Sequence, residues 1–530
     1  MNRIRLAAAI VCAMGASAAG AVPFVWSSAG DILTFDIHAQ NESLNSTAVN
    51  EVYEGLVRRN PKLEIEPCLA TSWKRVPEGF LFEIRRGVKF HEGETLTADD
   101  VVFSINRALN PKSQFRSSAT GILGAEKKGD YEVLLKTVNG SPVIIAELTT
   151  LMIMNKSWAE KHGALEPQDF IGHQEAYQAR HANGTGPFKL KSRQEDVKTV
   201  FVANEDWWDQ KNRVGNVTEL TYMPIKSAAT RTAALLSGQV QFVLDAATQD
   251  LARLKKSPGI KVEQGPETRM MMIAFDEYRD ASPYVRDAQG NPMKVNPFKD
   301  KRVRQALSLA VNRDGMVRGV MRGAAVASGT IVPKGVTGWT AVNAEPPKYD
   351  LARAKALLAE AGYPQGFGFT LDCPNNRWLN DENICKALAG MWAKAGVKVD
   401  VNAMPRAQYF PKILSFDISA ALVGWAGGAT FDGLFYLKPL SATYDKKTGM
   451  GISNIGRASD KEIDRIVEEV TREEDSAKRT KLLEEGMAIE KENVYHVPLQ
   501  QQTIPWAMRS NVQAVFRPDN RLTAEWVVVK

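Results

Sequence analysis

The stretch from Leu69 to Leu109 decides the fold: L-A-T-S-W-K-R-V-P-E-G-F-L-F-E-I-R-R-G-V-K-F-H-E-G-E-T-L-T-A-D-D-V-V-F-S-I-N-R-A-L. Residues 80–85 alternate between apolar and more polar side chains, which predicts a half-buried strand. Two glycines then interrupt the run. Thr97 followed by Asp100 is a helix-capping pattern, because the hydroxyl and the carboxylate can both satisfy N–H groups of a first turn. Apolar residues at helical spacing follow, so the spacing predicts a strand, a glycine turn and a capped helix, as many α+β fragments would have.

The residue types in this stretch are more specific than their spacing. The stretch resembles the signature region of the large extracellular solute-binding proteins of ABC importers, in the family that takes up di- and oligopeptides and nickel. The residues that match the family pattern are Leu69, Ser72, Trp73, Phe82, Arg85, Gly87, Val88, Lys89, Phe90, His91, Gly93, Thr97, Ala98, Asp100, Val101, Phe103 and Ser104. A match of this length is far more selective than a single short motif.

Four further segments resemble the same family in the same order along the chain. They are G-T-G-P-F-K-L at 184–190, N-E-D-W-W at 204–208, N-P-F-K-D-K-R-V-R-Q-A-L at 296–307 and Y-D-L-A-R-A-K-A-L-L-A-E-A-G-Y-P at 349–364. The resemblance therefore covers nearly the whole chain after its N-terminal segment.

The expected fold class is α/β, because apolar strands alternate with capped amphipathic helices along the chain. A chain of 530 residues is too long for one ordinary core, so two or three domains are expected. The resemblance implies a two-lobed periplasmic-binding-protein fold of the large peptide-binding type, with an extra subdomain inserted in lobe one. The boundaries it implies are 22–57, 184–275 and 498–530 for the core of lobe one, 58–183 for the inserted subdomain and 276–497 for lobe two.

The N-terminal segment predicts export. Arg3 and Arg5 precede an apolar run, and Ala19-Gly20-Ala21 forms a small-residue cleavage site, so residues 1–21 are read as a secretory signal peptide, with cleavage after Ala18 as the alternative. No later apolar run is long enough to span a bilayer. We expect a soluble mature protein, located in the periplasm of a bacterium that has two membranes.

Removal of the signal leaves three cysteines, an odd number for an oxidising compartment. Cys373 and Cys385 flank a short polar loop, and we expect a disulfide between them. Cys68 is then left over, and its position beside Pro67 favours a buried structural thiol over a reactive one. A free-thiol count on unreduced protein would distinguish these possibilities.

Composition and motifs argue against nucleic-acid binding and catalysis. The net charge of +6 is spread along the chain without a basic patch of interleaved aromatics. The sequence has no G-x-S-x-G and no P-loop pattern. His173 and His181 lack the spacing of a zinc site. We therefore expect no enzyme activity, no metal and no cofactor, and ATP hydrolysis would belong to separate cytoplasmic subunits.

The predicted ligand site is centred on Trp425. The family's peptide binders carry Trp-x-x-Asp here, and the aspartate pairs with the α-ammonium group of the peptide. This chain has Gly428 at the aspartate position, and Asp432 would replace it only if the loop folds back. Gly427 and its neighbours favour close approach of a ligand.

A second group of candidate site residues lies in and beyond the cysteine-flanked loop. Arg377 matches the position of an arginine that dipeptide binders use for the ligand carboxylate, which suits the two parallel N–H donors of a guanidinium group. The alternative for Arg377 is an ordinary surface arginine. Trp378 and Tyr409 are further aromatic candidates for the cleft wall.

The resemblance implies a substrate-binding component of an ABC transporter. It would capture a small peptide or peptide-like solute as a monomer and deliver it to inner-membrane permease subunits. A nickel chelate, an oligosaccharide or an opine-like compound is the alternative ligand. A periplasmic hydrolase and a chaperone-like protein are alternative functions of other classes.

Overall fold

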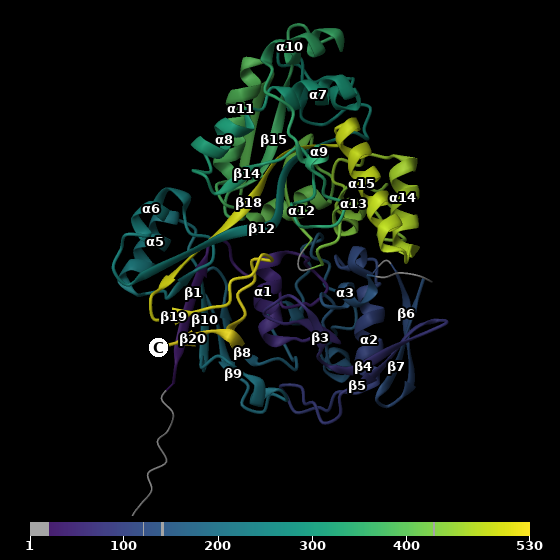
Figure 1. Cartoon of the computed structure of the whole chain (residues 1–530), viewed down its shortest axis with the longest axis vertical. Coiled ribbons are helices and arrows are strands. Elements are labelled where there is room, and N and C mark those ends of the chain that lie inside the picture. The colour runs from purple at the N-terminus through teal and green to yellow at the C-terminus, as the bar shows by residue number, and fades with distance from the viewer. Residues whose placement is uncertain (1–20, 120, 139–142, 428–429) are drawn as a thin grey trace, which may run out of the picture.

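The computed structural model describes residues 21–119, 121–138, 143–427 and 430–530. In this part of the chain, two α/β lobes are joined by two long antiparallel strands, β12 (Ile260–Phe275) and β18 (His496–Arg509), which run from the lower to the upper lobe in Figure 1. The expected signal peptide falls on residues 1–20 and the first described residue, so its structure lies outside the described part.

Lobe one, the lower lobe, is built around β1, which pairs in parallel with β10 and β11. Its core includes Phe24, Trp26, Phe242 and Trp506, all of them buried. The elements of lobe one are β1 (Pro23–Ser28), α1 (Ser43–Val52), β8 (Phe188–Gln194), β9 (Lys198–Ala203), β10 (Glu219–Pro224), α5 (Ala228–Ser237), β11 (Phe242–Val243), α6 (Leu251–Leu254), β19 (Val512–Gln513) and β20 (Val528–Val529).

A four-stranded antiparallel sheet in the order β4-β5-β7-β6 forms a subdomain beside lobe one. The strand and capped helix predicted from 80–109 are both present here, and the backbone N–H of Thr97 donates to Asp100 over 2.9 Å. The elements are β2 (Val57–Arg59), β3 (Ile65–Pro67), β4 (Ala70–Val76), β5 (Gly79–Ile84), α2 (Ala98–Ala108), β6 (Ile122–Gly129), β7 (Glu132–Thr137), α3 (Ile144–Leu148) and α4 (Lys156–Lys161). The subdomain has its own core from Leu56 to Ile153, whereas Met154 and Trp158 pack into the core of lobe one.

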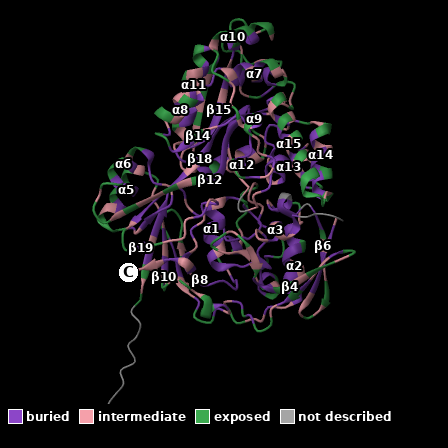
Figure 2. Cartoon of the chain, viewed as in Figure 1, coloured by how far each residue is buried: buried purple, intermediate pink, exposed green. Residues whose placement is uncertain are grey.

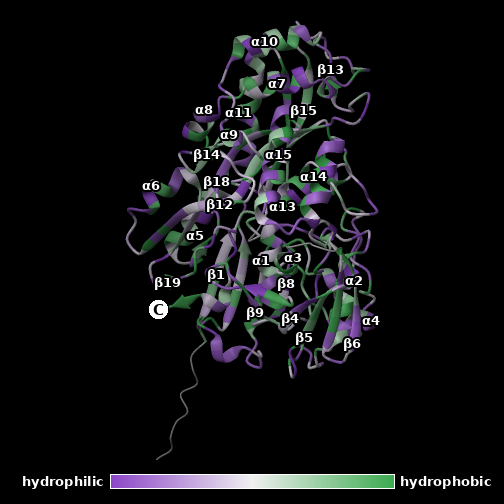
Figure 3. Cartoon of the chain, turned by 45° about the vertical axis from the view of Figure 1, so that its right-hand side comes forward, coloured by the Kyte–Doolittle hydropathy of each residue, from purple (hydrophilic) through white to green (hydrophobic). Residues whose placement is uncertain are grey.

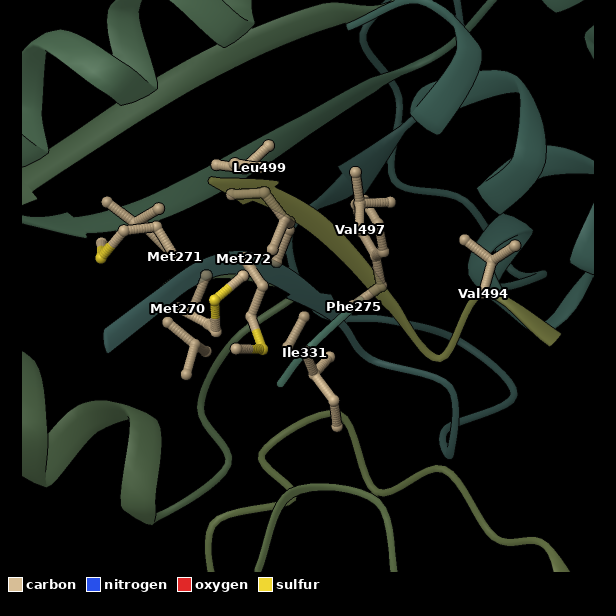
Figure 4. Packing of buried hydrophobic residues seen from close by; sticks show 14 of the residues in the cluster. Met270, Met271, Met272, Phe275, Ile331, Val494, Val497 and Leu499 are labelled. Atoms are coloured by element: carbon tan, nitrogen blue, oxygen red, sulfur yellow. The ribbon is translucent and has the colours of Figure 1, made fainter. Parts of the chain in front are cut away.

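Lobe two, the upper lobe, packs helices around β15, β16 and β17. Its elements are β13 (Val285–Arg286), α7 (Lys301–Leu309), α8 (Arg313–Gly319), β14 (Ala325–Ala327), α9 (Ala341–Ala344), α10 (Leu351–Glu360), β15 (Gly368–Pro374), α11 (Asp381–Lys394), β16 (Lys398–Met404), α12 (Arg406–Leu414), β17 (Ala420–Ala426), α13 (Leu434–Leu440), α14 (Lys461–Arg472) and α15 (Ser476–Asn493). Met270, Met271 and Met272 of β12 are fully buried in its core, close to Val497 and Leu499 of β18 (Figure 4).

One 12-stranded sheet passes through both lobes in the order β13-β15-β17-β12-β18-β11-β1-β10-β9-β8, with β14 on β18 and β16 on β15. The pairing of β12 with β18 shifts register between Pro266 and Met270. Pairs before the shift lie in lobe one and pairs after it contribute to the core of lobe two. The chain therefore crosses between the lobes inside these two strands.

The polarity of the surface follows from this layering. Buried residues follow the central strands, and exposed residues lie on the outer helices α6, α10 and α14 (Figure 2). Hydrophilic stretches are visible on α6 and α14 in Figure 3. Across residues 21–119, 121–138, 143–427 and 430–530, no helix combines the length and the apolar character that a membrane span requires.

Candidate ligand-binding site between the lobes

A cavity of about 220 Å³ lies between the two lobes. Lobe one contributes residues that follow the carboxyl ends of β1, β10 and β11, and lobe two contributes the loop after β15 and the start of α11. Ligands of open α/β sheets bind outside the carboxyl ends of strands, because loops and helix N-termini converge there. The cavity is lined by Ala29, Lys226, Ala228, Arg231, Asp245, Ala247, Gln249, Asn375, Asn376, Arg377, Trp378, Leu379, Asn380, Asp381, Glu382, Asn383 and Lys386.

The loop that carries Arg377 is held at both ends. Cys373 at the end of β15 and Cys385 in α11 form a disulfide with a Cα–Cα distance of 6.7 Å, so the expected bridge is present. Asp381 accepts the backbone N–H groups of Arg377 (2.9 Å) and Trp378 (3.0 Å). Cys68 is a buried free thiol.

The side chain of Arg377 is buried and forms an ion pair with Glu42 of lobe one. Arg406 at the start of α12 binds the second oxygen of the same carboxylate over 2.6 Å. Glu42 also caps α1 by accepting the N–H groups of Leu44 and Asn45. Burial alone would raise the pKa of Glu42, but the two guanidinium groups and the N–H donors lower it to about 2. The carboxylate is therefore charged at neutral pH and connects both lobes.

Several polar atoms of the cavity wall have no hydrogen-bond partner within the described residues. They are Nε of Arg231, Nε of Arg377, Nε1 of Trp378 and Oδ1 of Asn375, all buried. Burial lowers the pKa of Arg377 to about 10 despite the charge of Glu42. Because an unpaired buried polar group costs about 1–3 kcal/mol, such a wall fits a polar ligand that supplies the missing partners.

Trp425 is half-buried at the end of β17, and its indole N–H donates to the carbonyl of Phe435 over 2.6 Å. A Cβ atom added at Gly427 would lie 2.5 Å from Cε2 of Tyr436. The close approach at Gly427 is therefore made by a tyrosine of the protein itself. Gly428 lies outside the described residues.

Of the other predicted site residues, Tyr409 and Asp432 lie deeper in lobe two. Tyr409 is fully buried and its hydroxyl donates to the carbonyl of Leu422, which places it in the core. Both carboxylate oxygens of Asp432 accept from Arg479, so its charge is already compensated. Trp378 lines the cavity, although it is only 7% exposed. The structure thus brings Arg377 and Trp378 to the cavity and leaves Tyr409 and Asp432 away from it.

The sequence did not point to Glu42, Arg406 or Asp245, which the structure places at or beside this cavity. Glu42 stands directly before α1, whose start the sequence did not predict. No spacing in the sequence relates it to arginines that lie more than three hundred residues later. In the part of the chain that the structure describes, no cluster of three or more His, Cys, Asp or Glu side chains has the arrangement of a metal site.

Residues 64–448 match the family model of the bacterial extracellular solute-binding proteins, family 5. The chain belongs to this family. It is similar to heme-binding protein A of Haemophilus influenzae, with 28% identity over 484 residues that cover 85% of this chain and 81% of that protein.

Two solved structures of two-lobed binding proteins show the same fold. One is the periplasmic binding protein DppA of Helicobacter pylori with the peptide STSA, with a TM-score of 0.82, 22% identity and coverage of 96% of this chain and 98% of that chain. The other is AgaA of A. tumefaciens R10 with agropinic acid, with a TM-score of 0.83, 24% identity and coverage of 96% and 99%.

Family 5 proteins are substrate-binding components of ABC importers, and this chain has that role. Members bind peptides or other small ligands and work with ABC permeases. In Gram-negative bacteria they are periplasmic. The relatives are binding proteins rather than enzymes.

Proposed function

We propose that this protein captures a small peptide or peptide-like solute between its lobes in the periplasm and delivers it to inner-membrane permease subunits. The observation that carries the proposal is the interlobe cavity with the unpartnered Nε of Arg377 in its wall. A ligand carboxylate would supply the acceptor that this guanidinium group lacks.

Hinge closure explains how capture and delivery are linked. β12 and β18 are the long strands between the lobes, and their register shift between Pro266 and Met270 supplies a local irregularity at the crossing. A ligand that contacts both lobes stabilises the closed form by its contacts to the second lobe. The permease would then recognise the closed monomer.

A carboxylated non-peptide is the second candidate ligand. It is favoured by Gly428 at the position where peptide binders have an aspartate, and by the similar fold of AgaA with agropinic acid. Arg377 would hold its carboxylate in the same way, so the two candidates differ only in the rest of the ligand.

A thermal-shift screen tests the proposal on mature protein that has been partly unfolded and dialysed to remove carried-over ligand. The panel holds di- to pentapeptides, N-acylated peptides, glutathione, opines, nickel–histidine and oligosaccharides. A ligand at a hundred times its dissociation constant stabilises by about 2.7 kcal/mol, which gives a visible shift in melting temperature. Shifts with peptides or peptide-like acids are expected, whereas shifts with neutral oligosaccharides alone would contradict the proposal.

A further inference from the structure

A second cavity, of about 100 Å³, lies where the subdomain meets lobe one. Its wall is formed by the end of α1, by β2, by the loop after α3 and by the C-terminal segment at 517–526, and it shares no residue with the wall of the interlobe cavity. A cavity of this size has room for several water molecules at ~10–15 Å³ each, but lies below the ~300 Å³ at which pockets for drug-sized ligands begin. It therefore suits a small ion or a single polar group.

Two arginines of this wall form no ion pair within the described residues. Nη1 of Arg59, at the end of β2, donates to the carbonyl of Leu63 over 2.6 Å, and its Nε is buried without a partner. Nη1 of Arg521 donates to the side-chain oxygen of Asn50 over 3.0 Å when the amide of Asn50 is oriented to satisfy both of its groups. Because a guanidinium group has five N–H donors, one neutral hydrogen bond uses a small part of the capacity of each.

A third arginine of the same wall is paired. Arg517 donates to both carboxylate oxygens of Asp519, which leaves that carboxylate little capacity for the other two arginines. Burial and the nearby charges of Arg517 and Arg521 lower the pKa of Arg59 to about 10, although Asp519 opposes the shift. Arg59 thus remains a cation at neutral pH and lies close enough to the other two arginines to be repelled by them.

The acids of the wall do not neutralise this charge. Glu54 accepts from the indole N–H of Trp208 and from the hydroxyl of Thr185, each over 2.8 Å. Burial raises the pKa of Glu525 to about 7, although Arg58 opposes the shift, so a large share of Glu525 is uncharged at neutral pH. The wall therefore carries an excess of positive charge that a bound anion would balance.

We propose that Arg59 and Arg521 bind a doubly charged oxyanion, of the phosphate or sulfate type, in this cavity. The planar guanidinium group matches the oxygens of such anions with parallel N–H donors, and two unpaired cations match two negative charges. Arg59 belongs to the subdomain and Arg521 to the C-terminal segment of lobe one, so the anion would connect the two. This inference is independent of ligand capture between the lobes.

Thermal unfolding of the full mature chain tests the inference with sodium phosphate, sodium sulfate and sodium acetate, each at an ionic strength held constant with chloride. We expect a saturable rise in melting temperature with phosphate and with sulfate, because a ligand that binds only the folded state stabilises it. Phosphate and sulfate also stabilise folded proteins without binding a site, so only the saturable part of the rise counts. No saturable rise with phosphate and sulfate, or an equal one with acetate, would overturn the inference.

Glycerol 3-phosphate distinguishes two sources of the anion. A saturable rise with this ester as well as with inorganic phosphate would assign the cavity to the phosphate group of a larger organic ligand. A rise with inorganic phosphate alone would assign it to the free ion, as the small volume of the cavity favours.

Variants locate the bound anion. Arg59→Gln and Arg521→Gln should each raise the apparent dissociation constant for phosphate at least tenfold, while Arg59→Lys, which keeps the charge, should retain part of the affinity. Arg253→Gln, at an exposed arginine of α6 outside the cavity wall, is the matched control and should respond to phosphate as wild-type protein does. Each variant is compared with itself in the absence of phosphate, so a change in its own stability does not affect the result. A wild-type response of both glutamine variants would overturn the inference.

Discussion

Among the described residues, the buried carboxylates of Glu42 and Glu147 form ion pairs with lobe two, and they differ in how well each carboxylate is satisfied. Glu42 receives two guanidinium groups and two backbone N–H groups. Glu147 of α3 faces only Lys438 of α13 at 3.7 Å, longer than a hydrogen bond, although both side chains are 2% exposed. Burial removes water from both carboxylates at a cost in free energy. Only the partners of Glu42 compensate this cost fully.

The pKa values of the two acids move in opposite directions for this reason. The partners of Glu42 lower its pKa to about 2. Burial raises the pKa of Glu147 to about 7, because Lys438 compensates only in part and nearby Asp432 adds repulsion that Arg479 only partly offsets. The carboxylate of Glu42 thus stays charged at physiological pH, whereas the charge of Glu147 changes with pH in that range.

The largest expected effect comes from Glu42→Gln, which keeps a cap acceptor but removes the charge between Arg377 and Arg406. Two buried guanidinium groups are then left without a carboxylate, and we expect a loss of about 3–5 kcal/mol of unfolding free energy. Urea unfolding measures the loss, and small-angle X-ray scattering detects opening of the lobes.

Asp350→Asn is the matched control for Glu42→Gln. Asp350 caps α10 at the surface by accepting from the N–H of Arg353, and Asn is an equally good cap, so the expected change is below about 0.5 kcal/mol. Equal stability of Glu42→Gln and wild-type protein would contradict the conclusion that the carboxylate of Glu42 is satisfied better than that of Glu147.

The second effect concerns the loop that presents Arg377. The double variant Cys373→Ser/Cys385→Ser releases a loop with a sequence separation of 12, which predicts a loss of about 3 kcal/mol. Affinity for an acidic ligand should fall as well, because the loop positions Arg377. Thermal unfolding and calorimetric titration measure the two changes.

A thiol assay provides the control for the disulfide variant. Denatured mature protein should show one free thiol, that of Cys68, before reduction and three after it. Three free thiols before reduction would show that the bridge is absent and would explain an unchanged stability of the double variant.

The sequence predicted elements better than contacts. Local signals sufficed for β5, for α2 with its Thr97–Asp100 cap and for the disulfide, because their determinants lie within a few residues of one another. Arg377 was predicted to be a site residue because it resembles a family position. Its partner Glu42 was not, since no local pattern links residues of different lobes.

The distance of Tyr409 and Asp432 from this cavity also depends on partners far away in the sequence. Each lies in a segment that the family pattern brings near the cleft. How deeply its side chain is buried, however, depends on contacts with residues outside that segment. The hydroxyl of Tyr409 donates a hydrogen bond to the carbonyl of Leu422, and the guanidinium group of Arg479 donates to the carboxylate of Asp432. Burial of a polar residue is therefore decided by partners elsewhere in the chain.

The smallest expected effect is the part of the pH dependence that Glu147 contributes. Its pKa is about 7 in the folded protein and 4.5 in an unperturbed chain, so the folded state binds more protons between these values. The stabilisation is fully present below pH 4.5 and is lost as pH rises through 7, opposite to Glu42, whose contribution is lost only as pH falls through 2. Between pH 5 and 8, wild-type protein should lose about 2.5 kcal/mol relative to Glu147→Gln in urea unfolding. Glu205→Gln, at an exposed acid of lobe one, should show the pH profile of wild-type protein. A Glu147→Gln profile parallel to that of wild-type protein would mean that Lys438 satisfies Glu147 as fully as the two arginines satisfy Glu42.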